Sequence, residues 1–113
     1  MSPRILIAED EPLTGFDIAA TLKALGFEPV GPAPTVGAAR ELLASGVDGA
    51  IVDYDLNGEP ADALIQDLVR RAVPFVVSSG EMRRIDLGQG SRSERFGKPM
   101  LSEELIDALR RLM

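Results

Sequence analysis

The apolar run at residues 49–52 stops abruptly at Asp53, and it constrains the fold more than any other stretch of the chain. An apolar run of this length that ends at polar and turn residues predicts a buried strand of a parallel sheet. Near the start of the chain, the run at residues 5–8 leads in the same way into Glu9 and Asp10. Ligands of open α/β sheets gather beyond the carboxyl ends of the strands. We therefore expect both runs to bring acidic side chains to one edge of a sheet.

Apolar runs of this kind alternate with stretches in which apolar residues recur at helical spacing. Strands are expected at residues 4–8, 28–31, 49–53, 73–77 and 95–97. The polar stretch 81–93 predicts only a short or poorly ordered helix, and the other helices are expected at residues 12–25, 36–45, 61–68 and 103–112. Strands that alternate with helices predict one parallel sheet with helices on both faces and right-handed crossovers.

Four details of this pattern depend on a few residues. Leu13 and Phe16 are expected to extend the buried face of the first helix. Pro32 and Pro34 are expected to break the second strand, because proline lacks the N–H of the strand ladder. Residues 57–60 predict a loop by their turn chemistry, and Ser102 predicts the N-terminal cap of the last helix.

The expected architecture is a doubly wound, five-stranded parallel sheet in three layers (α/β/α), with the flavodoxin-like strand order 2-1-3-4-5. In this order the switch point lies between the first and third strands, which are the strands that end at Glu9, Asp10 and Asp53. A length of 113 residues suits one domain. We therefore expect a single domain over residues 1–113, without an output domain.

The composition excludes several classes of partner and chemistry. The chain has 12 basic and 18 acidic residues, a net charge of -6 and no extended basic patch, so nucleic acid is a poor partner. No apolar stretch approaches the roughly 20 residues that span a membrane, and no signal pattern is present, so we expect a cytoplasmic protein with no membrane partner. Because the chain has no His and no Cys, any imidazole in its chemistry comes from another molecule.

Three carboxylates that converge from two strand ends repel one another unless a cation joins them. Oxygen ligands without His or Cys favour Mg²⁺ or a similar hard ion. A carboxylate beside such an ion can act as a nucleophile toward phosphorus and form an aspartyl phosphate. Ser79, at the end of the fourth strand, and Lys98, after the fifth, are placed to bind the remaining phosphoryl oxygens.

The chain resembles the receiver domain of two-component response regulators throughout, with the motifs in order at residues 5–12, 51–53, 76–80 and 98–99. Within that family it is similar to stand-alone receivers of alphaproteobacterial type. The resemblance implies that Asp53 is the phosphoacceptor and that Ser79 and Lys98 contact the phosphoryl group. It also implies a Mg²⁺ site made by Glu9, Asp10, Asp53 and the backbone carbonyl of Asp55.

The resemblance implies partners as well as a site. A histidine kinase or a histidine phosphotransfer protein is expected to donate the phosphoryl group, and a downstream protein is expected to read it, with the receiver a monomer or a phosphorylation-dependent dimer. The resemblance implies that the chain is not an enzyme with a separate substrate and that it catalyses only its own phosphoryl acceptance and dephosphorylation. Phosphorylation is expected to draw Ser79 inward and Lys98 across, which biases a surface made by the loop after the fourth strand, the fifth strand and the last helix.

Four positions depart from the usual receiver pattern or tune it. The aromatic switch residue usually lies three positions before the lysine, where this chain has Arg95, with Phe96 next to it. Asp55 and Glu81 lie two positions beyond the acceptor and the switch hydroxyl, where side chains affect water attack. We expect both acids to influence the lifetime of the phosphoryl group.

Three alternative functions stay open. A receiver that does not accept phosphate would act only as a docking module. The acids after the first strand, with Asp53 and Asp55, also resemble the Toprim module, a Mg²⁺-dependent nucleic-acid catalyst, although the acidic surface argues against it. The same Asp-x-Asp pattern resembles haloacid-dehalogenase-type phosphatases, whose motif opens a longer chain with a cap.

Overall fold

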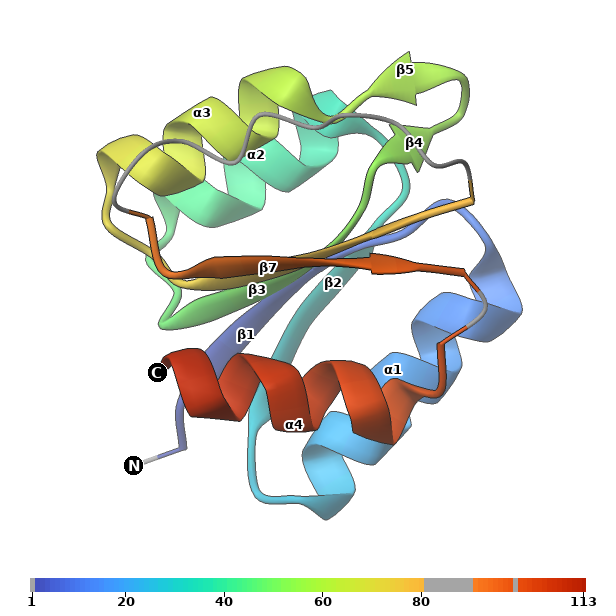
Figure 1. The fold of residues 1–113 in the computed structure, drawn as a ribbon, viewed down its shortest axis with the longest axis vertical. Coiled ribbons are helices and arrows are strands. Elements are labelled where there is room, and N and C mark those ends of the chain that lie inside the picture. Colours follow the sequence, from blue (N-terminus) through green and yellow to red (C-terminus); the bar gives the residue numbers. More distant parts are fainter. Residues whose placement is uncertain (1, 81–90, 99) are drawn as a thin grey trace.

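Within residues 2–80, 91–98 and 100–113, which the computed structural model describes, five parallel strands form one sheet between two layers of helices (Figure 1). The order across the sheet is β2-β1-β3-β6-β7. The strands are β1 (Arg4–Ala8), β2 (Glu28–Ala33), β3 (Gly49–Asp53), β6 (Phe75–Ser79) and β7 (Ser93–Gly97). Counted along these five strands, the order is 2-1-3-4-5, so the predicted doubly wound, flavodoxin-like fold is confirmed.

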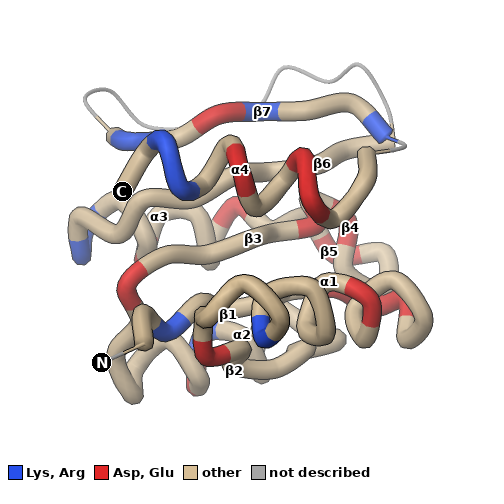
Figure 2. The backbone as a smooth tube through the Cα atoms, turned by 90° about the horizontal axis from the view of Figure 1, so that it is seen from below, with Lys and Arg blue, Asp and Glu red and all other residues tan. Residues whose placement is uncertain are grey.

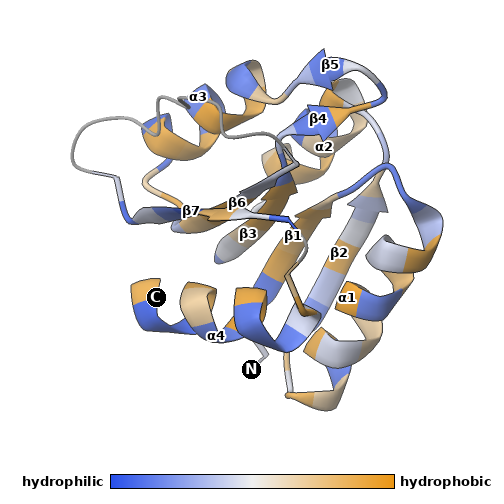
Figure 3. Ribbon diagram, turned by 45° about the vertical axis from the view of Figure 1, so that its right-hand side comes forward, coloured by the Kyte–Doolittle hydropathy of each residue, from blue (hydrophilic) through white to orange (hydrophobic). Residues whose placement is uncertain are grey.

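Two pairs of helices cover the two faces of the sheet (Figure 1). They are α1 (Pro12–Ala24) and α4 (Ser102–Leu112) on one face, and α2 (Val36–Ala44) and α3 (Asp62–Arg70) on the other. Hydrophobic strands lie between helices that carry hydrophilic residues on their outer sides (Figure 3). Within the described ranges, no helix combines the length and the apolar character that crossing a membrane requires.

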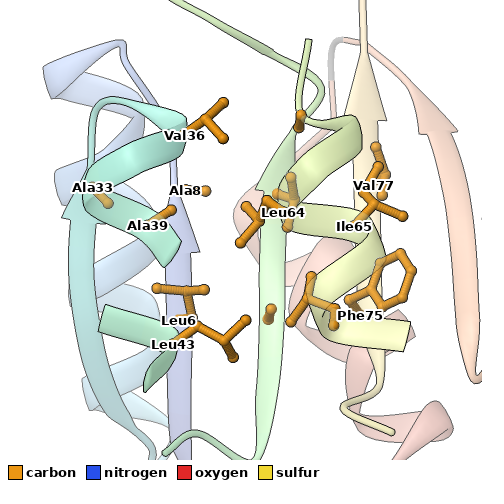
Figure 4. Packing of buried hydrophobic residues seen from close by; sticks show 14 of the residues in the cluster. Leu6, Ala8, Ala33, Val36, Ala39, Leu43, Leu64, Ile65, Phe75 and Val77 are labelled. Carbon is orange, nitrogen blue, oxygen red and sulfur yellow. The ribbon is translucent and has the colours of Figure 1, made fainter. Parts of the chain in front are cut away.

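The sheet separates two hydrophobic clusters, because successive strand residues point to opposite faces. Ile5 and Ile7 of β1 pack with α1 and α4. Leu6 and Ala8 of the same strand pack with α2 and α3, in the cluster that Figure 4 shows from close by. Strands buried on both faces explain the nearly continuous apolar runs in the sequence.

Two of the detailed expectations are wrong near the N-terminal half of the sheet. Strand β2 continues through Pro32, because an edge strand tolerates a residue without an N–H, and the register shifts by one residue there. Leu13 and Phe16 are 78% and 65% exposed, since α1 buries the side formed by Gly15, Ile18 and Leu22 instead. A Cβ on Gly15 would lie 2.8 Å from the ring of Pro32, so glycine lets α1 approach β2 closely.

Other details differ in the loops and in the C-terminal half. The expected loop after Asp53 contains a small antiparallel ribbon, β4 (Asp55–Leu56) and β5 (Glu59–Pro60), around a turn in which Asn57 and Gly58 have positive φ. Ser102 is the first residue of α4 and bonds Asp17 instead of capping the helix. The helix start is held by Glu104, which accepts the N–H of Leu101 at 3.2 Å.

Strand β6 begins later than expected, and β7 begins earlier. Strand β6 runs from Phe75 to Ser79, so both serines belong to the strand, and β7 begins at Ser93, two residues before the expected start. The short or poorly ordered helix expected at residues 81–93 falls mostly on residues 81–90, which lie outside the described residues.

Candidate functional site

Three carboxylates meet at the carboxyl ends of β1 and β3. Glu9 and Asp10 directly follow β1, and Asp53 is the last residue of β3. One carboxylate oxygen from each residue lies within 4.8 Å of the others, and we call this group the acidic cluster. Figure 2 shows acidic residues gathered where β3 ends, beside β4 and the start of α1. Glu9 and Asp53 are each only 5% exposed, so the sheet holds these charges in a largely buried edge.

Backbone groups fix the orientation of the two acids that follow β1. The N–H of Glu9 donates to the carbonyl of Ala33 at 2.9 Å, which continues the pairing of β1 with β2. Glu9 Oε2 accepts the N–H of Glu11 at 3.1 Å. Asp10 Oδ2 accepts the N–H of Asn57 at 2.8 Å, from the turn between β4 and β5. The turn therefore supports the acidic cluster directly.

Lys98 brings the single positive charge of the described site to the Asp53 carboxylate. Its Nζ donates to Asp53 Oδ2 at 2.8 Å. Its backbone N–H donates to the carbonyl of Ser79 at 2.9 Å, so the end of β7 fixes the lysine beside the end of β6. One lysine offsets only one of the three carboxylate charges. The remaining negative charge favours binding of a second cation.

The proton affinities of these groups reflect this charge imbalance. Burial, and then the neighbouring Asp53 carboxylate, raise the pKa of Glu9 from 4.5 to about 7. Burial acts in the same direction on Asp10, but the N–H of Asn57 and the other hydrogen bonds outweigh it and lower the pKa of Asp10. Burial opposes the charge of Lys98, yet its hydrogen bond and its attraction to Asp53 raise the pKa of Lys98.

Two serines end β6, beside the end of β3. Ser78 is paired with Asp53 in the sheet register, and its carbonyl accepts the N–H of Tyr54 at 2.9 Å. Ser79 is 2% exposed and ends the strand one residue further on. Sequence reasoning singled out Ser79 and missed Ser78, because the pairing of Ser78 with Asp53 depends on a register that the sequence does not reveal.

The other predicted site residues differ in how they are placed relative to Asp53. Asp55 begins β4 and is half-buried, and its N–H donates to Asp53 Oδ1 at 3.3 Å. Phe96 is paired with Ser78 and packs against the α1 and α4 cluster. Arg95 is exposed on β7. The residues next to it in the strand point to the opposite face of the sheet. Glu81 lies outside the described residues.

The donor set of the acidic cluster fits a hard divalent cation. All three side chains offer carboxylate oxygens, and no described His or Cys competes because the chain has neither. Mg²⁺ binds through one or two carboxylates and keeps waters and phosphate oxygens as its other ligands. The arrangement can therefore hold such an ion next to a carboxylate, Asp53, that also contacts a lysine.

Sequence reasoning also missed the contribution of Asn57. The Asn-Gly pair is a strong signal for a two-residue hairpin turn with positive φ at both positions. Asn57 and Gly58 have φ of 53° and 84°, as such a turn requires. The signal could have predicted the ribbon, but only the structure brings the N–H of this turn to Asp10 across the sheet edge.

Comparisons with known proteins agree with this geometry at the level of the fold. No model of a known protein family matches the chain, and no curated protein matches it. SdrG from Sphingomonas melonis Fr1 is 32% identical, with 98% of this chain and 96% of that chain covered and a TM-score of 0.79. A response regulator receiver protein from Sinorhizobium medicae WSM419 is 27% identical, with 98% and 94% covered and a TM-score of 0.77. The chemotaxis response regulator CheY4 of Vibrio cholerae is 17% identical, with 100% of this chain and 100% of that chain covered and a TM-score of 0.83.

Proposed function

The chain belongs to the receiver domain family of response regulators, and we propose that it accepts a phosphoryl group on Asp53 from a phosphohistidine partner. The observation that carries the proposal is the contact of 2.8 Å between Lys98 Nζ and Asp53 Oδ2, inside the acidic cluster. A carboxylate that is buried, lysine-bound and next to a cation site is suited to attack phosphorus. A solvated acid at a strand end would have none of these three features.

In the proposed reaction, one oxygen of Asp53 attacks phosphorus while the P–N bond to the donor imidazole breaks. Lys98 and the hydroxyl of Ser79 bind phosphoryl oxygens and stabilise the charge that they gain. Glu9, Asp10 and Asp53, with the backbone carbonyl of Asp55, would hold Mg²⁺ at the same edge. When bound, this ion offsets the negative charge that gathers between the phosphoryl group and the carboxylates.

The donor is proposed to be a histidine kinase or a histidine phosphotransfer protein. The chain has no His, so the phosphorylated imidazole must belong to another molecule. The receiver then acts through the phosphoryl group that it carries, with no separate substrate. The lifetime of that group is tuned by Asp55 and Glu81, which we propose as neighbours of the attacking water.

Signal output is proposed to follow from movement of Ser79 and Lys98 toward the phosphoryl group. Both residues end strands next to each other, and the N–H of Lys98 already binds the carbonyl of Ser79. A shift at this point would reach β7 and the start of α4, where Phe96 packs against the helices. This surface is the proposed contact for a downstream protein or for a second, phosphorylated copy.

The test is the intact mass after incubation with phosphoramidate and Mg²⁺. We expect a gain of one phosphoryl group, which Asp53→Ala and a metal chelator each abolish. Asp48→Ala, at an exposed acid after α2, serves as the matched control and should gain the group as the unmodified chain does. No gain under any condition would contradict the proposal and would favour a docking module.

A further inference from the structure

A cavity of about 160 Å³ lies beside the acceptor carboxylate, between α1, the end of β6 and the start of α4. Its walls are apolar on the helix side and polar on the side of the acidic cluster. The lining residues are Glu9, Thr14, Ile18, Ser78, Lys98, Met100 and Leu105. The cavity therefore has the mixed character of a small-molecule subsite, with a few polar groups that converge on an apolar pocket.

Ser78 places a hydroxyl group on the polar side of the cavity. Its side chain is 6% exposed, and within the described residues its hydroxyl makes no hydrogen bond. No side-chain oxygen of the described residues is both fully buried and without a partner, so the Ser78 hydroxyl is open to water in the cavity. Ser78 follows the fully apolar strand residues Val76 and Val77. A ligand in the cavity would replace that water as the partner of the hydroxyl.

The cavity shares two walls with the proposed acceptor site. Lys98 lines it and also contacts Asp53 at 2.8 Å. Glu9 lines it and has an oxygen within 4.8 Å of the Asp53 oxygen. Ser78 is paired with Asp53 in the register, so both side chains point to the α1 and α4 face. A group that leaves phosphorus as Asp53 attacks would thus be within reach of the cavity.

We propose that this cavity receives the imidazole ring of the phosphodonor and that Ser78 accepts a hydrogen bond from its N–H. The proposal rests on the proposed function, and it identifies the group that the site takes in addition to the phosphoryl group. A flat ring with one N–H and apolar faces matches one unpaired hydroxyl between the aliphatic walls of Ile18 and Leu105. The ring must come from outside, because the chain has no His.

The hydrogen bond has a defined place in the transfer. Asp53 forms the new P–O bond while the P–N bond breaks, and the electron pair of that bond stays on the ring nitrogen. If the second ring nitrogen carries a proton throughout, the ring leaves as neutral imidazole and no proton has to move. Ser78 holds the ring in this protonation state by accepting the hydrogen bond from that N–H. Its role is to bind the leaving group, while Lys98 binds the phosphoryl oxygens.

The test compares two donors that share a P–N bond and differ in the ring. Phosphoimidazole carries the ring, whereas phosphoramidate loses only ammonia. We measure initial rates by intact mass and take the ratio of the phosphoimidazole rate to the phosphoramidate rate. One neutral hydrogen bond corresponds to about a twofold to tenfold change. Ser78→Ala should lower this ratio by about fivefold, Ser78→Thr should keep it, and Ser45→Ala, away from the cavity, should leave it unchanged.

A second variant tests the cavity without touching Ser78. Thr14 is exposed on α1 and lines the cavity, so Thr14→Phe should narrow the opening and lower the same ratio with little risk to folding. A ratio that stays constant in Ser78→Ala and Thr14→Phe would overturn the proposal.

Binding of imidazole alone is measured separately by amide chemical shifts. We expect shifts at residues 14, 78 and 105 that weaken in Ser78→Ala. Their absence would mean that the cavity holds water only, which would also overturn the proposal. If neither donor phosphorylates the chain, the proposed function fails, and this titration still decides whether the cavity takes the ring.

Discussion

Because the pKa of Glu9 is raised, the free energy of unfolding without metal should depend on pH, and this dependence reports on the acidic cluster. In the folded chain this pKa is about 7, against 4.5 for the ordinary side chain. Between these values the folded state binds more protons than the unfolded state, so stability is fully present below 4.5 and is lost as the pH rises through 7. The full shift corresponds to about 3 kcal/mol. From about pH 5 to about pH 8 we expect the free energy of unfolding in a chelator to fall by about 2 kcal/mol.

The assay is urea unfolding followed by far-ultraviolet circular dichroism, because the chain has no Trp and only one Tyr. The absence of His removes the side chains that usually titrate in this window. Glu9→Gln should abolish the dependence on pH, whereas Glu41→Gln, on the exposed side of α2, should keep it. Saturating Mg²⁺ should remove the loss, since the ion binds the charged form of the folded state. Stability that is flat or rises with pH in the chelator, or an equal slope in Glu9→Gln, would refute the reasoning.

The other predictions concern glycines. Gly15→Ala should destabilise by about 1–3 kcal/mol, because its Cβ would lie 2.8 Å from the rigid ring of Pro32. Gly37→Ala, in α2 with open space around the site, should raise the free energy of unfolding by roughly 0.5–1 kcal/mol in the same urea titration. An equal effect of the two changes would contradict the close approach of α1 to β2. Gly58→Val should strain the turn, because Gly58 has a φ of +84°. The N–H of the neighbouring residue supports the acidic cluster, so the change should weaken Mg²⁺ binding by about tenfold in calorimetry. Gly26→Val, at φ +91° beyond the end of α1, should cost similar stability without changing Mg²⁺ affinity, so a loss of affinity in both variants would remove the role of the turn.

The periodicity of the sequence predicts most of the fold, because buried parallel strands and amphipathic helices leave clear patterns. The order of the sheet followed from alternation and from the general rules of such sheets. The exposure of Leu13 and Phe16 was not predictable, because the close packing of α1 depends on Gly15, a residue without a side chain, which packs against Pro32. Leu13 and Phe16 have the right character for a core, but the close approach of helix and strand turns them outward.

The candidate site was predictable where chemistry lies in side chains at strand ends. Glu9, Asp10 and Asp53 meet as expected, and Lys98 reaches Asp53. Two contributions were hidden from the sequence for physical reasons. The N–H of Asn57 is a backbone group that any residue could offer, and its partner lies 47 positions away. Ser78 depends on the register between β3 and β6, which is set by packing of the whole sheet.

The contact between Lys98 and Asp53 joins positions 45 residues apart. During synthesis, Asp53 therefore meets Lys98 only after β7 has left the ribosome and paired with β6. An incomplete chain or one cut before β7 keeps Asp53 but lacks its cation. The pairing of Asp53 with Lys98 thus depends on closure of the sheet by β7.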